Sequence, residues 1–264
     1  MPDPATDSIT EQPPLSPSRL KVEVALVFAI SLGRSGVYAL VYLGAALTAG
    51  TPLSNLSAPL NSSQAPASRP TLDLVYQLLG IAFALVPVLL ACHFLLIGGE
   101  RPTKVLGIDR SQPRRDIVRG LVLAALIGGS GLAFYLIAFK LGISLKIVAS
   151  GLNDNWWKIP VLLLSAAQNA ILEEVLVAGY LVHRLGQLGV RPWPAVAASA
   201  LLRGSYHLYQ GFGGFVGNAI MGTLFARLYQ RWGRTAPMII AHTLIDSVAF
   251  VGYALLAHKV SWLP

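Results

Sequence analysis

The chain has 264 residues, of which 54% are hydrophobic and 12% are charged, and its formal net charge is +8. Soluble globular proteins carry roughly 25% charged residues, so this composition excludes an ordinary soluble domain and indicates a polytopic membrane protein. The basic residues gather at the ends of apolar runs, so the positive charge needs no nucleic-acid partner to explain it. The single cysteine, Cys92, excludes a disulfide framework and a zinc site built from cysteines.

Residues 1–21 are rich in proline and mixed charge and are predicted to form a disordered cytoplasmic tail. Residues 22–264 are predicted to form a single all-α transmembrane domain of about seven helices, with six to eight as the range, because a span needs roughly 20 apolar residues. The expected spans are 24–49, 72–97, 120–139, 159–182, 195–209, a sixth that follows 211 and ends near 226, and 236–257.

Lysine and arginine are distributed unevenly between alternate loops. Thirteen lie in the loops that share a side with the N-terminus, against five on the other side. Because basic residues accumulate in cytoplasmic loops, this favours seven helices with the N-terminus in the cytoplasm and the C-terminus outside.

Two adjacent acids, Glu173 and Glu174, lie inside the fourth predicted span. An ionised carboxylate in hydrocarbon costs at least ~2.5–3.5 kcal/mol, and two neighbouring carboxylates repel each other. We therefore expect a wet intramembrane site in which one acid is protonated or is matched by a buried cation.

Other ionisable side chains are predicted to reach the same level of the membrane. At 1.5 Å per residue, Glu173 lies roughly 14 Å from the cytoplasmic end of its helix, His207 about 18 Å and Asp246 about 15 Å. His242 is four residues before Asp246, so both side chains lie on one face of the last span. Supporting positions in this layer are assigned to Asn169, Arg203 and Arg34.

This set of residues permits two forms of hydrolysis. A glutamate and a histidine can activate a water as a general base, while a second histidine with a polar partner stabilises the oxyanion. Alternatively, Glu173, His207, His242 and Asp246 could hold a divalent metal such as zinc. The sequence has no HExxH motif, and only one aspartate, Asp246, lies deep within a span, which excludes an aspartyl dyad.

A further motif, Gly128-Gly129-Ser130-Gly131, spells the GxSG of rhomboid serine proteases. Small residues also let transmembrane helices pack closely, and we interpret the motif in that way.

Over about residues 155–256, the chain resembles the CPBP family of intramembrane endopeptidases, which includes the CAAX prenyl proteases. The matching elements are Glu173-Glu174 on one helix, His207 on the next, and His242 followed four residues later by Asp246. The resemblance implies a catalytic bundle in the C-terminal half, a bacterial plasma membrane protein and a membrane-tethered polypeptide substrate. It further implies that Glu173, assisted by His207, activates water, that His242 and Asp246 form the oxyanion side, and that Glu174 supports the site.

Two positions depart from the family pattern. The arginine expected four residues after Glu174 is Ala178, and the phenylalanine expected four residues before His207 is Arg203. We predict that the two changes are linked, with Arg203 supplying from the adjacent helix the charge that position 178 lacks.

Two other classes of function remain open at this point. An inactive family member could serve as an immunity or scaffolding protein. A proton-coupled transporter could also use buried acids and histidines, although such transporters usually show inverted repeats, and none is visible in the sequence.

Overall fold

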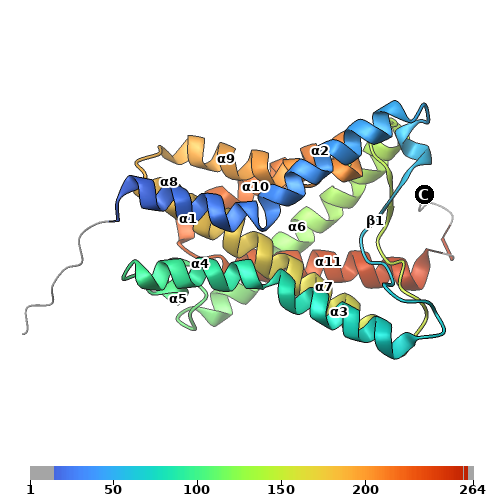
Figure 1. Cartoon of the computed structure of the whole chain (residues 1–264), viewed down its shortest axis with the longest axis horizontal. Coiled ribbons are helices and arrows are strands. Elements are labelled where there is room, and N and C mark those ends of the chain that lie inside the picture. The colour runs from blue at the N-terminus through green and yellow to red at the C-terminus, as the bar shows by residue number, and fades with distance from the viewer. Residues whose placement is uncertain (1–14, 258, 261–264) are drawn as a thin grey trace, which may run out of the picture.

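Helices make up nearly all the regular structure in residues 15–257 and 259–260, the part of the chain that the computed structural model describes (Figure 1). The helices are α1 (Pro17–Ala29), α2 (Leu32–Thr48), α3 (Pro70–Ala84), α4 (Val86–Ile97), α5 (Pro102–Val105), α6 (Pro113–Lys140), α7 (Lys158–Glu173), α8 (Leu181–Gln187), α9 (Pro192–Ser205), α10 (Phe212–Trp232) and α11 (Ala236–Leu256). A π-helix, η2 (Glu174–Tyr180), joins α7 to α8, and the 3₁₀ turns η1 (Leu53–Asn55) and η3 (Leu208–Gln210) complete the helical elements. The strands are β1 (Ser57–Pro59) and β2 (Lys146–Val148).

Among the described residues, four helical segments are long and apolar enough to cross a membrane, and α1 with α2 forms a fifth if that bent pair is one span. These four are Pro70–Ile97, Pro113–Lys140, Lys158–Gln187 and Ala236–Leu256. The all-α polytopic membrane fold is thus confirmed. The predicted count of seven also needs α9 and α10 as spans. These two helices pack along each other, but neither is both long enough and apolar enough to be counted as a membrane span. With 14 residues, α9 is about 21 Å long, less than the ~30 Å of a hydrocarbon core.

The first helix begins earlier than predicted. Ser16 caps α1 by accepting a hydrogen bond from the backbone N–H of Arg19, and Pro17 occupies the first turn. The predicted tail over 1–21 is therefore wrong for the residues from 17 onward, while residues 1–14 lie outside the described part of the chain.

The first predicted span, 24–49, is not one straight helix. It breaks between α1 and α2, which are bent by 51°. The Ser31 hydroxyl donates to the carbonyl of Val27 at the break, and a Cβ on Gly33 would lie only 2.6 Å from the Phe28 carbonyl oxygen. Depth counted along a straight helix therefore does not give the position of Arg34, which lies beyond the bend.

Ion-pair networks fasten the end of the bundle at which α1 begins. The buried guanidinium of Arg184 contacts Glu23 at 3.0 Å and Glu100 at 2.6 Å, and so ties α8 to α1 and to the loop after α4. Arg234 similarly joins the start of α11 to Asp109 and Asp116, both at 2.7 Å.

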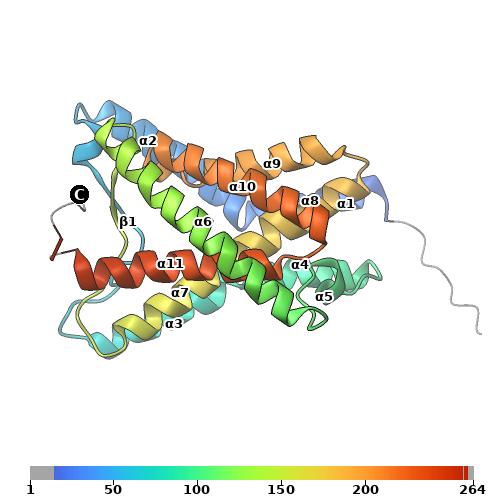
Figure 2. The same ribbon diagram turned by 180° about the vertical axis from the view of Figure 1, so that it is seen from behind.

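The opposite end of the bundle, which we call the β end, carries a small cap. β1 and β2 pair in parallel, with Ser57 beside Lys146, and Figure 1 shows the cap lying across the ends of the long helices. Figure 2 shows α6 and α11 crossing near the start of α11 and diverging toward this end. Side chains from both helices line a cavity there.

Candidate active site

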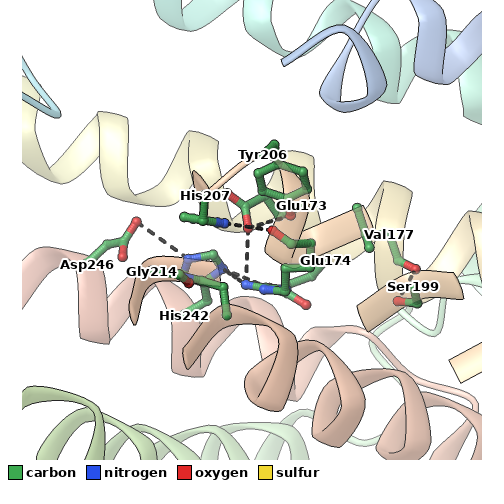
Figure 3. A network of polar contacts seen from close by, with 11 residues as sticks. Glu173, Glu174, Val177, Ser199, Tyr206, His207, Gly214, His242 and Asp246 are labelled. Carbon is green, nitrogen blue, oxygen red and sulfur yellow. Dashed lines mark hydrogen bonds and ion pairs between the residues drawn. The ribbon is translucent and has the colours of Figure 1, made fainter. Parts of the chain in front are cut away.

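The helix that carries the two glutamates changes its winding at the site. α7 ends at Glu173, and Glu174 begins the π-helix η2. π-helical turns often occur at functional sites, since they alter the direction of side chains and free backbone carbonyls. Here the Ser199 hydroxyl of α9 donates to the carbonyl of Val177 at 2.9 Å (Figure 3). Of the two acids at this junction, Glu173 lines the cavity, whereas Glu174 is fully buried.

The cavity has a volume of about 1060 Å³ and lies between α6, α11, the turn after α9 and the cap. The structure brings together on its wall most of the residues singled out from the sequence. Those that line it are Asn169, Glu173, His207, His242 and Asp246, while Glu174 and Arg203 lie behind the wall. Arg34 is exposed on α2 and, within the described residues, has no ion pair or hydrogen bond, so its predicted place beside the acids is wrong.

The two oxygens of Glu173 have different surroundings. Oε2 accepts a hydrogen bond from the Tyr206 hydroxyl at 2.9 Å and lies 3.1 Å from Nη2 of Arg203 (Figure 3). Oε1 has no hydrogen-bond partner in the described part of the chain and is not sealed from the cavity. One oxygen is therefore held by two donors, and the other is available to a water or a substrate.

Arg203 is the cation of the site. Its side chain is fully buried, with Nη1 at 2.8 Å from Oε1 of Glu174 and Nη2 at 3.2 Å from Nδ1 of His242. The guanidinium also lies 5.4 Å from the ring centre of Phe225, in a cation–π contact. The expected contact of Arg203 with the glutamates is confirmed. Ala178 packs in an apolar cluster that also contains Phe225, so the two positions share a neighbour.

The hydrogen bonds assign a tautomer to His207. Its Nδ1 lies 2.9 Å from the carbonyl oxygen of Arg203, and a carbonyl can only accept, so Nδ1 carries the proton. The neutral ring then has its lone pair on Nε2. His207 can therefore accept a hydrogen bond from a water in the cavity.

His242 lies between two acids. Its Nδ1 is 2.7 Å from Oε1 of Glu174, the shorter of its two contacts, and we assign the proton on Nδ1 to that bond. Its Nε2 is 3.6 Å from Oδ2 of Asp246, just beyond hydrogen-bond distance. A substrate or water in the cavity could therefore approach both His242 and Asp246.

Tyr206 is the functional candidate that the sequence did not reveal. It lies in the turn after α9, is 5% exposed and donates directly to Glu173. Helical periodicity gives no information on such a turn. Only its position next to His207 could have drawn attention to it.

Glu173, Glu174 and His242 offer three ligand atoms within 4.8 Å of one another, as a metal site requires. The guanidinium of Arg203, however, already contacts all three side chains at 2.8–3.2 Å. Zinc would need the same oxygen and nitrogen atoms at about 2.0–2.2 Å, with a second positive charge beside the first. A metal does not fit this cluster while Arg203 keeps its place.

The glycine motif of α6 does not pack as predicted. A Cβ added to Gly129 or Gly131 would meet no atom within 4 Å, and one added to Gly128 would touch only Ile245 at 3.6 Å. All three glycines line the cavity instead, and the Ser130 hydroxyl donates to the carbonyl of Leu126 in its own helix. These residues therefore widen the cavity.

The comparisons with known proteins point to one family. Residues 155–248 match the family model described as type II CAAX prenyl endopeptidase Rce1-like, and this range contains both glutamates, Arg203, His207, His242 and Asp246. No curated protein and no solved structure matches the chain.

Proposed function

Because residues 155–248 match the family model of the Rce1-like type II CAAX prenyl endopeptidases, we propose that the chain is an intramembrane endopeptidase that hydrolyses a membrane-associated polypeptide. The observation that carries the proposal is the free Oε1 of Glu173 on the wall of a large, mostly apolar cavity that His207 also lines. A carboxylate and an unprotonated imidazole nitrogen are both acceptors. Together they suit a water that donates one hydrogen bond to each.

In the proposed reaction, Glu173 removes a proton from this water as the water oxygen attacks the scissile carbonyl carbon. His207 receives the second hydrogen bond of the water and thereby fixes its orientation. The proton on Glu173 is then passed to the leaving nitrogen, and the carbon–nitrogen bond breaks. Tyr206 and Arg203 hold Oε2 of Glu173 so that Oε1 stays directed at the water.

The oxyanion that forms on the substrate would be bound from the other side of the site. His242, with Nδ1–H bound to Glu174, presents Nε2 to the cavity close to Asp246. A proton on Nε2 would be stabilised by the flanking acids and could be donated to the oxyanion. Glu174 and Arg203 act behind this wall as positioning residues.

No step of this mechanism uses a metal. Arg203 supplies the positive charge at the three side chains that could otherwise bind one. We also propose that the N-terminus faces the cytoplasm of a bacterial cell, which the excess of lysine and arginine in the loops at that end supports.

The test compares the termini of membrane proteins in cells that carry the wild type or Glu173→Gln. Substitution by glutamine keeps the size of the side chain but removes the base, and we expect a set of cleaved termini to disappear. Asp154→Asn is the matched control, because the Asp154 side chain is fully exposed and precedes α7, the 16-residue helix that has Glu173 at its other end. Identical termini in wild type and Glu173→Gln cells, with both proteins folded and expressed equally, would refute the proposed activity.

A further inference from the structure

A second, smaller cavity lies on the other side of α7. It has a volume of about 330 Å³ and is formed by α3, α7 and the segment that follows β1. Leu60 and Asn169 line both this cavity and the large one, so the two spaces are neighbours on either side of these residues. A cavity of this size is large enough to hold several waters.

The walls of this cavity are polar although α3 and α7 are transmembrane helices. α7 contributes Ser165, Gln168 and Asn169, which continue along one face of the helix to Glu173. Ser165 and Gln168 have no side-chain hydrogen bond to any described residue, and their polar atoms are not sealed off. Unpaired polar groups are strongly unfavourable in hydrocarbon, so these groups need water.

A series of polar groups leads from the surface toward the active site. At the β end it begins at Gln64, which is exposed, and passes Gln77, whose amide donates to the carbonyl of Ser62 at 2.9 Å. At its inner end, Asn169 lies beside the carboxylate of Asp246. Ser165 precedes Glu173 by eight residues, which is about 12 Å along the helix.

From this geometry we propose that the smaller cavity is a water channel that supplies Glu173 from the β end, separately from the route taken by the substrate. The inference rests on the proposed hydrolysis. An apolar substrate segment in the large cavity would exclude water from that side. A second route allows water to reach Glu173 while the substrate is bound.

Hydration of the channel can be measured without any substrate. The Gln168→Cys variant is made in a protein that also carries Cys92→Ala, so that it has a single thiol. It is placed in lipid nanodiscs, and the rate at which the thiol reacts with a hydrophilic reagent is measured. Leu164→Cys is the matched control, because Leu164 lies one turn earlier on an exposed, lipid-facing part of the same helix. We expect the thiol at position 168 to react at least about tenfold faster than the thiol at position 164, since the reactive thiolate requires water. Equal rates would overturn the channel.

Supply of water to the reaction is tested by closing the channel. Gly80 lines it, and a Cβ at Gly80 meets no atom within 4 Å, so Gly80→Leu adds an apolar side chain to the cavity wall at a position with free space at Cβ. Gly44 on α2 is equally free but lines neither cavity, which makes Gly44→Leu the control. We expect Gly80→Leu and Gln168→Leu to lower kcat about tenfold with little change in KM, as for a loss confined to the chemical step.

The results separate the two proposals. Fast labelling at position 168 with wild-type kcat in both leucine variants would refute the supply of water but leave the endopeptidase intact. Absence of cleavage by the wild type would refute the endopeptidase, while the labelling rates would still decide whether the channel is hydrated.

Discussion

Replacing Arg203 by methionine tests the electrostatic core of the site most directly. The guanidinium is fully buried and contacts Glu173, Glu174 and His242. Methionine has a similar length but leaves the two acids without their cation. Removing one partner of a buried ion pair typically destabilises a protein by about 3–5 kcal/mol, and we expect a loss of that size in the free energy of unfolding.

Unfolding in mixed micelles with increasing SDS, followed by tryptophan fluorescence, measures this loss. The matched control is Arg227→Met, because Arg227 is exposed on α10 and contacts Trp193 and Gln230 at the surface. A surface substitution of that kind should change stability by about 0.5 kcal/mol or less. If Arg203→Met were no more destabilising than Arg227→Met, Arg203 would not be the counter-ion of the glutamates.

Moving the arginine from position 203 to position 178, where the family pattern has it, tests whether Arg203 positions Glu173 or only fills space. Arg203→Phe alone should abolish peptide hydrolysis, because it removes the charge next to Glu173. Adding Ala178→Arg returns an arginine one turn after Glu174, beside the same Phe225, and should restore part of the activity. An increase in stability without any return of hydrolysis would contradict the link between the two positions.

Three other predictions follow from the site and its surroundings. Tyr206→Phe should lower kcat about tenfold, equivalent to ~1.4 kcal/mol, because Glu173 loses one hydrogen bond while the ring still fills its place; unchanged kcat would refute this role. Treatment with EDTA or a phenanthroline chelator should leave hydrolysis intact, whereas a loss that zinc reverses would contradict the metal-free mechanism. The Ser111 hydroxyl and Arg234 lower the pKa of Asp109 from 3.8 to about 2. The stabilisation from Asp109 should therefore be complete above pH ~4 and disappear as the pH falls toward ~2. Unfolding measured across this range should show a pH-dependent part that is missing in Asp109→Asn.

The sequence predicted the site residues better than it predicted the path of the first helices. Hydropathy placed Glu173, His207 and Asp246 at one depth, and the structure brings all three to one cavity. The same depth argument failed for Arg34, because the chain bends by 51° between α1 and α2 and the side chain turns outward. Depth along a helix can be counted from the sequence only while the helix stays straight.

The amino-acid sequence by itself determined that the protein lies in a membrane and that costly ionisable groups gather in its C-terminal half. These conclusions depend on composition and local spacing, which need no knowledge of how the helices pack. Only the tertiary structure decided that Glu173 reaches the cavity while Glu174 is enclosed with Arg203. The winding changes from α-helix to π-helix between these two glutamates, and a turn outside any helix brings Tyr206 to Glu173. Both features depend on contacts between segments far apart in the chain, such as that of Ser199 with Val177, and no local pattern encodes them.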